Sequence, residues 1–233
     1  MKYRFILLDA DNTLFDFDAC EKKAFVQAME SFGVAPTDTM YHTYRSINHD
    51  CWKQLEKGQI TREELQILRY ARFTREFSLA IDPAGLNEQY VSNLSKIGIL
   101  LPGAAEFVEA LSKKAEVYIV TNGIARVQHG RFKDCPLVPY IRHIFISEEV
   151  GAAKPDKAFF DRVAQMIPDF DSKRAIVIGD SLSSDIQGAN NASLACIWYN
   201  PNAQTASNER IDYTVSEYGE ILRILEQGDP HEN

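Results

Sequence analysis

The chain is poor in the residues that mark disordered, fibrous or disulfide-linked proteins. Its 233 residues include only 12 glycines, 9 prolines and 4 cysteines, whereas 45% of the side chains are hydrophobic and 11% are aromatic. Disordered and collagen-like chains do not combine so many apolar residues with so little glycine and proline, so we expect a packed core. The absence of a CxxC pair or of zinc-ligand spacing predicts buried, reduced thiols at Cys20, Cys51, Cys135 and Cys196.

Basic residues and long apolar runs are also scarce. The chain has 25 Lys and Arg residues against 33 Asp and Glu residues, a net charge of −8. This excludes an extended basic surface for nucleic acid, and a bound phosphate group would need a local cation. No apolar run reaches the roughly 18 residues of a membrane helix, and residues 4–8 are too short for a signal peptide. We therefore expect a cytoplasmic protein without a nucleic-acid or membrane partner, and the sequence leaves its oligomeric state open.

Short apolar runs alternate with stretches of helical period along most of the chain. The runs that predict strands are 4–8, 116–121, 142–147, 174–180, 194–200 and 212–215. The stretches that predict helices are 103–114, 123–133, 155–167, 183–191 and 216–227. This alternation is typical of an α/β protein with a parallel sheet and helices on both faces.

Residues 15–98 break this alternation. Asp18 followed by Glu21 is typical of a capping box at a helix start, and Gly33 is a typical helix end. Three more helical stretches follow, near 39–57, 62–79 and 84–97. We therefore expect two domains, a sheet domain made of 1–14 and 99–233 and a helical insert of 15–98.

Polar residues follow several of the predicted strands. Because ligands of such sheets bind beyond the carboxyl ends of the strands, these residues are candidates for a site. They are Asp9 and Asp11 after the first strand, Thr121 and Asn122 after the second, Lys154 before the helix that follows the third, and Asp180 and Asp185 after the fourth.

Gathered carboxylates repel one another and need a cation, and Mg²⁺ suits oxygen ligands best. A carboxylate can also accept a phosphoryl group as a nucleophile. Taken singly, several of these residues are also typical of ordinary structure: a capped turn for Asp9, Asp11 and Thr121, or a solvated side chain for Lys154. Asp180 is different, because an acid at the end of a buried strand needs a partner or a metal.

The order of four motifs makes the pattern specific. They are DADNT after the first strand, TNG after the second, KP after the third and GDSLSSD after the fourth. In these motifs the chain resembles the haloacid dehalogenase (HAD) superfamily of phosphohydrolases, over essentially its whole length. The resemblance implies a Rossmann-like α/β core and identifies 15–98 as an inserted helical cap of the C1 type.

The resemblance also implies roles for the motif residues. Asp9 would be the nucleophile, and Asp11 would protonate the leaving oxygen and later activate water. The carboxylates of Asp9 and Asp180 and the main-chain carbonyl of Asp11 would hold Mg²⁺, with Asp185 as a supporting acid. The phosphoryl oxygens would be bound by Thr121, Asn122 and Lys154.

Further segments resemble the pyrimidine 5'-nucleotidase subgroup of the superfamily, the YjjG/YfnB type. They are DADNTLFDFD, 48–52 with 58–61, Arg69, ISEEVGAAKP and 198–200. The subgroup implies a nucleoside monophosphate substrate such as UMP, dUMP or dTMP. In the cap, Phe17 and Trp52 are candidates for stacking on the base, and Asn48 and Arg69 for reaching its edge or the sugar. Each of these four residues is also typical of ordinary helix packing.

Two alternative functions remain open, and the sequence departs from the subgroup's pattern at two positions. A phosphatase or phosphomutase acting on sugar phosphates or phosphoglycolate would keep the same motifs, and so would a HAD-like binding protein without turnover. Dehalogenation is disfavoured, because haloacid dehalogenases lack the second aspartate, Asp11 here. Asn12 stands where the subgroup more often has an acid or glycine, and Ser193 stands where relatives have glycine, which predicts strain in that turn.

Overall fold

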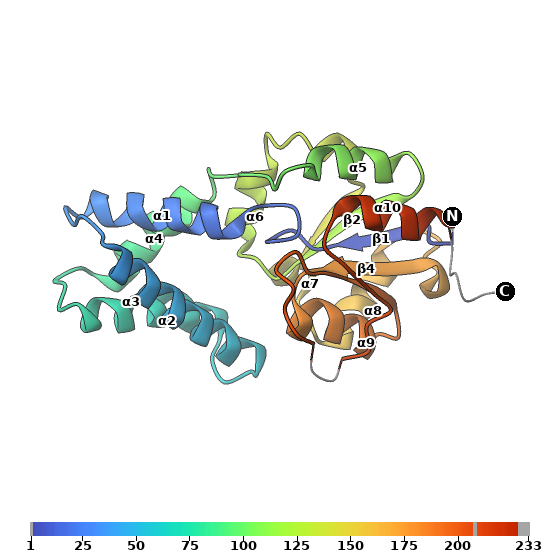
Figure 1. Cartoon of the computed structure of the whole chain (residues 1–233). Helices are drawn as coiled ribbons and strands as arrows, with labels where there is room; N and C mark the ends of the chain where they lie inside the picture. Colours follow the sequence, from blue (N-terminus) through green and yellow to red (C-terminus); the bar gives the residue numbers. More distant parts are fainter. Residues whose placement is uncertain (1, 207–208, 228–233) are drawn as a thin grey trace. The chain divides into compact units, whose positions relative to one another are not determined.

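The computed structural model describes residues 2–206 and 209–227. Its six strands form one parallel sheet in the order β3-β2-β1-β4-β5-β6 (Figure 1). The strands are β1 (Phe5–Leu8), β2 (Glu116–Thr121), β3 (His143–Ile146), β4 (Ala175–Gly179), β5 (Ala195–Tyr199) and β6 (Tyr213–Val215). The predicted α/β class is confirmed, and each predicted strand is found within about two residues of its expected ends.

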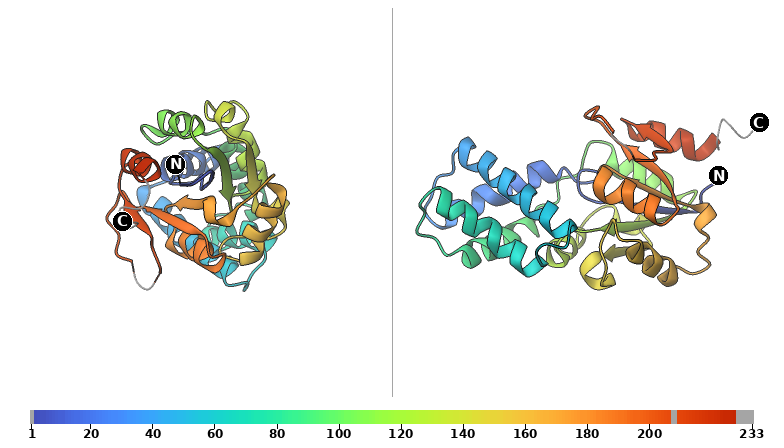
Figure 2. Two further views of the ribbon diagram at one scale, coloured as in Figure 1. Left: turned by 90° about the vertical axis from the view of Figure 1, so that its right-hand side faces the viewer. Right: turned by 90° about the horizontal axis from the view of Figure 1, so that it is seen from below.

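Helices cover both faces of the sheet. Successive side chains of a strand point to opposite faces, so Ile6 and Leu8 join one core cluster and Phe5 and Leu7 join another. The first cluster packs against α5 (Ala104–Ser112), α6 (Ala125–Phe132) and α10 (Tyr218–Gln227), and the second against α8 (Lys157–Met166) and α9 (Gln187–Asn191). The views in Figures 1 and 2 show α5 and α10 on the face opposite α8 and α9.

The strand order brings the ends of three strands together around β1. From β1 the chain continues on one side to β2 and β3 and on the other to β4, β5 and β6, so the order reverses between β1 and β4. Leu8 is in register with Ile119 of β2 and with Ile178 of β4. The residues that follow these strands therefore meet at one edge of the sheet, where doubly wound sheets bind ligands.

Residues 18–98 form a second compact unit, described by itself. Its helices are α1 (Phe17–Ser31), α2 (Asp38–Glu56), α3 (Arg62–Glu76) and α4 (Pro83–Leu94), with α1 starting in the sheet unit at Phe17. The helical insert was predicted from residue 15, whereas Phe15 pairs with Leu100 in the sheet unit. A capping box does form, at Thr61 and Glu64.

The capping box predicted at Asp18 and Glu21 is wrong. The main-chain N–H of Phe17 donates instead to Oδ1 of Asn12, at 3.1 Å. Asp18 accepts from Arg45 at 2.8 Å, and Glu21 lies buried inside the helical unit. Because α1 starts at Phe17, Asp18 lies inside the first helical turn and is not the residue that caps it.

The four cysteines are buried and free of disulfides, as predicted. Among the described residues, no helix combines the length and the apolar character needed to cross a membrane.

Both departures from the subgroup pattern lie in left-handed backbone. Asn12 has φ 57° and Ser193 has φ 56°. Asparagine tolerates this region through local hydrogen bonds, and Asn12 makes one to Phe17, whereas serine is strained there. The strain predicted for the turn after the fourth-strand helix is therefore found at Ser193.

Ser193→Gly is expected to stabilise the protein. Relief of the left-handed strain exceeds the added chain entropy of glycine by roughly 0.5–1 kcal/mol, a rise in Tm of about 2 °C. Asn12→Gly is the matched comparison, since it also removes the hydrogen bond to Phe17 and is expected to gain nothing. Thermal unfolding of both variants checks this, and a lower Tm for Ser193→Gly would contradict the interpretation.

Candidate active site

Lys154 lies at the centre of the charged groups at the carboxyl edge of the sheet. Its ammonium group donates to Oδ1 of Asp9 at 2.7 Å, to Oδ1 of Asp185 at 2.6 Å and to the carbonyl of Val120 at 2.8 Å. These contacts use all three of its N–H donors, and the side chain is 1% exposed. A buried lysine so placed joins the ends of β1, β2 and β4.

Three carboxylates gather around this lysine. Asp9, Asp180 and Asp185 each offer an oxygen atom, and these atoms lie within 4.8 Å of one another. Three carboxylates against one ammonium group leave two negative charges in excess when all are ionised. Hard oxygen donors with this excess charge fit a divalent cation such as Mg²⁺.

The local sequence explains how the acids reach this edge. Gly179 ends β4, and a Cβ added there would lie 2.2 Å from Oδ2 of Asp185, so glycine leaves the space that this carboxylate fills. Asp185 is carried by a π-helical turn, η3 (Leu182–Ile186), and accepts from the N–H of Ser181 at 3.1 Å. The indole N–H of Trp198 fixes the carbonyl of Asp180 at 2.8 Å.

Burial shifts the pKa of the Asp9 and Asp180 carboxyl groups. It raises the pKa of Asp9 to about 7, against the opposing charge of Lys154. Burial also raises the pKa of Asp180 to about 8, and the nearby charges of Asp9 and Asp185 add to the rise. For Lys154, burial lowers the pKa but the carboxylates of Asp185 and Asp9 outweigh it, so the pKa is raised and the side chain stays charged.

These shifts predict a pH-dependent response to Mg²⁺. In the metal-free protein Asp9 and Asp180 bind protons more tightly when folded than when unfolded, so they lower stability as the pH rises from about 4 towards 8. Mg²⁺ binds the ionised carboxylates. We therefore expect MgCl₂ to raise Tm much more at pH 8 than at pH 5, measured by thermal unfolding with EDTA as the reference.

Two variants control this measurement. Burial also raises the pKa of Glu21, in the helical unit, to about 7, so Glu21→Gln is expected to flatten the pH profile without changing the response to Mg²⁺. Asp180→Asn is expected to remove most of that response. An equal rise in Tm at both pH values, or a full response in Asp180→Asn, would count against a metal site here.

Thr121 and Asn122 hold the second motif in place. The Thr121 hydroxyl accepts from the N–H of Gly123 at 3.0 Å. The Asn122 amide donates to the carbonyl of Lys154 at 2.7 Å and accepts from its N–H at 3.0 Å. Asn122 therefore fixes the main chain that carries the central lysine, a use of its side chain that the predicted phosphate contact did not include.

Asp11 lies apart from the three-carboxylate group. Its Oδ1 accepts from Arg131 at 2.6 Å and its Oδ2 from Gln128 at 2.9 Å, both on α6. The metal contact predicted for Asp11 was its main-chain carbonyl, so metal binding would not occupy the carboxylate that is predicted to act as acid and base. Gln128 and Arg131 were missed by the sequence reading, although polar residues three apart on the apolar face of a helix are a usable signal.

The four cap candidates lie in different surroundings. Asn48 and Arg69 are buried in the helical unit, where Nη1 of Arg69 donates to Oδ1 of Asn48 at 3.2 Å and Asn48 donates to Glu21 at 2.8 Å. Phe17, in the sheet unit, and Trp52, in the helical unit, are half-buried. The structure therefore places Asn48 and Arg69 in a buried network, whereas both aromatic rings keep some exposed surface.

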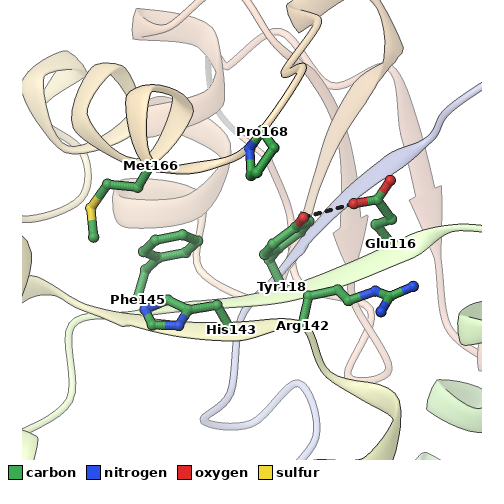
Figure 3. A pocket seen from close by; sticks show the side chains of 7 residues that line it. All are labelled: Glu116, Tyr118, Arg142, His143, Phe145, Met166 and Pro168. Atoms are coloured by element: carbon green, nitrogen blue, oxygen red, sulfur yellow. Dashed lines mark hydrogen bonds between the residues drawn. The ribbon is translucent and has the colours of Figure 1, made fainter.

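The sheet unit has surface hollows that lie away from the residues of the candidate site. One is lined by Glu116, Arg142, His143 and Met166, at the amino ends of β2 and β3 (Figure 3). There Tyr118 donates to Glu116 at 2.8 Å. Among the described residues, the one group of three or more acidic, histidine or cysteine side chains able to share a metal ion is that of Asp9, Asp180 and Asp185.

Known proteins resemble the chain over nearly its whole length. The model of the haloacid dehalogenase-like hydrolase family matches residues 3–193. The pyrimidine 5'-nucleotidase PynA of Streptococcus pneumoniae is 37% identical over 229 residues, covering 97% of both chains. The pyrimidine 5'-nucleotidase YjjG of Escherichia coli is 32% identical, covering 97% of this chain and 99% of YjjG.

A solved structure agrees with these relatives. The crystal structure of the HAD-hydrolase YfnB of Bacillus subtilis, bound to magnesium, matches with a TM-score of 0.92 and 33% identity, covering 97% of this chain and 100% of YfnB. The resemblance to the superfamily, predicted from the four motifs, and to its pyrimidine 5'-nucleotidase members, predicted from the further segments, is thereby confirmed. The chain belongs to the haloacid dehalogenase-like hydrolase family and is an enzyme of that family.

Proposed function

We propose that the protein is a cytoplasmic, Mg²⁺-dependent phosphatase that removes the 5'-phosphate from pyrimidine nucleoside monophosphates such as UMP, dUMP and dTMP. The observation that carries the proposal is the group of three carboxylates, Asp9, Asp180 and Asp185, gathered near one buried lysine, together with the Asp11 carboxylate held by α6. Similarity to two pyrimidine 5'-nucleotidases supports the choice of substrate. Family membership supports hydrolysis.

In the proposed reaction Asp9 is the nucleophile. Its carboxylate oxygen bonds to phosphorus while the bond from phosphorus to the 5'-oxygen breaks, and the Asp11 carboxyl gives its proton to that oxygen. The nucleoside leaves, and Asp9 carries the phosphoryl group. The ionised Asp11 then takes a proton from water as the water oxygen bonds to phosphorus, which frees Asp9 and releases phosphate.

The neighbouring residues hold charge and position. Asp9, Asp180 and the Asp11 carbonyl would hold Mg²⁺, with Asp185 beside them. When bound, Mg²⁺ supplies positive charge that offsets the negative charge of the phosphoryl group. Lys154 already gives its three N–H groups to protein oxygens, so it acts mainly through its charge and by orienting Asp9. Thr121 offers its hydroxyl to the phosphoryl oxygens, and Asn122 keeps Lys154 in place.

The substrate is tested by phosphate release from UMP, dTMP, AMP, phosphoglycolate and glucose 1-phosphate, with Mg²⁺ or with EDTA. We expect kcat/KM for UMP and dTMP to exceed the values for the two non-nucleotides at least tenfold, on the order of what one binding pocket discriminates. EDTA is expected to abolish release. Phe17 and Trp52 stay our candidates for stacking on the base.

Other results would replace the proposal. Equal rates on nucleotides and sugar phosphates would contradict the nucleotidase, and conversion of glucose 1-phosphate to glucose 6-phosphate would indicate a mutase. No release from any compound, with Mg²⁺ present, would indicate a binding protein.

A further inference from the structure

Two polar residues of α6 are buried beside Asp11. Gln128 is 0% and Arg131 is 4% exposed, although one ends in an amide and the other in a charged guanidinium. Gln128 Nε2 lies 2.9 Å from Oδ2 of Asp11, and Arg131 Nη2 lies 2.6 Å from Oδ1. Both carboxylate oxygens of Asp11 are therefore held by one helix, through donors three residues apart.

The two donors are themselves fixed. The Arg131 guanidinium lies over the rings of Phe15 and Phe17, at 4.7 and 5.9 Å. The Gln128 amide also donates to the Thr121 hydroxyl at 3.2 Å. A Cβ added at Gly123 would lie 2.0 Å from Nε2 of Gln128, so the glycine of the second motif leaves room for this amide.

Stability alone does not explain this arrangement. A buried guanidinium loses its hydration, and Nε and Nη1 of Arg131 have no hydrogen-bond partner among the described residues. Its ion pair with Asp11 is what offsets the burial. A well-packed apolar residue would serve the core at least as well, so the charge is placed for the carboxylate it holds.

We propose that Gln128 and Arg131 are positioning residues that hold the Asp11 carboxyl for both proton transfers. The inference rests on the proposed function, in which Asp11 gives a proton to the leaving oxygen and later takes one from water. A carboxylate has about four acceptor sites, so one bond to each oxygen fixes its orientation and leaves a site on each for the proton. Through Thr121, the same amide ties this carboxyl to the second motif.

Leaving-group dependence tests this role. The 5'-oxygen of UMP must be protonated as it leaves, whereas p-nitrophenyl phosphate releases a stable anion that needs no proton. In Gln128→Met and Arg131→Lys we expect kcat/KM for UMP to fall about 10- to 100-fold, the effect of a misplaced catalytic group, and kcat/KM for p-nitrophenyl phosphate to stay within about twofold. His129→Gln, exposed on the same helix, is the control and is expected to match wild type.

A double-mutant cycle separates positioning from a general structural role. In an Asp11→Asn background the two substitutions are expected to cost less than about twofold more on UMP, because their effect runs through the lost carboxyl. Thermal unfolding checks that each variant is folded. If Arg131→Lys does not fold, the test is made with Gln128→Met alone. Equal losses on both substrates, or undiminished losses in Asp11→Asn, would overturn the inference.

The proposed function can fail separately. If wild-type enzyme hydrolyses another alkyl phosphate but not UMP, the substrate proposal fails. That alkyl phosphate then replaces UMP in the comparison with p-nitrophenyl phosphate, and the comparison still tests the positioning role. If wild-type enzyme hydrolyses no phosphate ester, both proposals are overturned.

Discussion

Asp9→Asn is expected to reduce phosphate release by a factor on the order of 10⁴ or more, because an amide cannot accept the phosphoryl group. Stability should move the other way. The substitution removes a buried carboxylate from a group with excess negative charge, so in EDTA at pH 8 the variant should unfold at the same or a higher temperature than wild type. Lys154 keeps Asp185 and the Val120 carbonyl as partners.

The measurement is a phosphate-release assay paired with thermal unfolding. Asp161→Asn is the matched control, since Asp161 is exposed and pairs with Lys157 on the same helix at 2.5 Å. The control is expected to be fully active. An active Asp9→Asn variant would show that another group attacks phosphorus.

Lys154→Met is expected to impair both activity and stability. Without the ammonium group the buried carboxylates of Asp9 and Asp185 lose their ion pairs, which costs about 3–5 kcal/mol and lowers Tm by roughly 10 °C. The positive charge that we propose stabilises the phosphoryl group is also lost, so kcat/KM should fall about 100- to 1000-fold. Mg²⁺ should restore part of the lost stability, because it supplies positive charge to the same carboxylates.

Lys157→Met provides the comparison for this variant. Lys157 is exposed, three residues away, and its ion pair with Asp161 is expected to contribute at most about 1 kcal/mol. The activity and Tm of both variants are measured side by side, with Mg²⁺ and with EDTA. Near-normal turnover by folded Lys154→Met would show that this lysine does not contribute to catalysis.

The fold and the core of the site follow from local signals. Short apolar runs that alternate with helical stretches predict a parallel sheet. The polar residues that follow several of these runs predict a ligand site at one edge of that sheet. Asp9 and Asp180 meet there because β1 and β4 are neighbours in register, with Leu8 beside Ile178. The apolar runs do not predict the order of the strands in the sheet, which the structure gives.

Contacts between side chains distant in sequence could not be predicted. Asp11 and Arg131 are 120 residues apart, and their ion pair depends on how α6 is rotated above the sheet. Asn122 was predicted to contact phosphate, and the sequence did not show that its amide also bonds to the main chain of Lys154, 32 residues on. For Arg69, the sequence shows a polar residue on a helix but not that tertiary packing buries it beside Asn48.

The central claim is that Asp9 carries the phosphoryl group during turnover. It is tested by mixing Asp11→Asn with p-nitrophenyl phosphate and Mg²⁺, quenching with acid during the first turnover, and measuring the mass of the peptide that contains residue 9. Without the Asp11 base the intermediate should accumulate, so we predict a phosphorylated Asp9 that is absent in the Asp9→Asn, Asp11→Asn double variant. Release of p-nitrophenol without phosphorylated Asp9, or a phosphoryl group on another residue, would contradict the account.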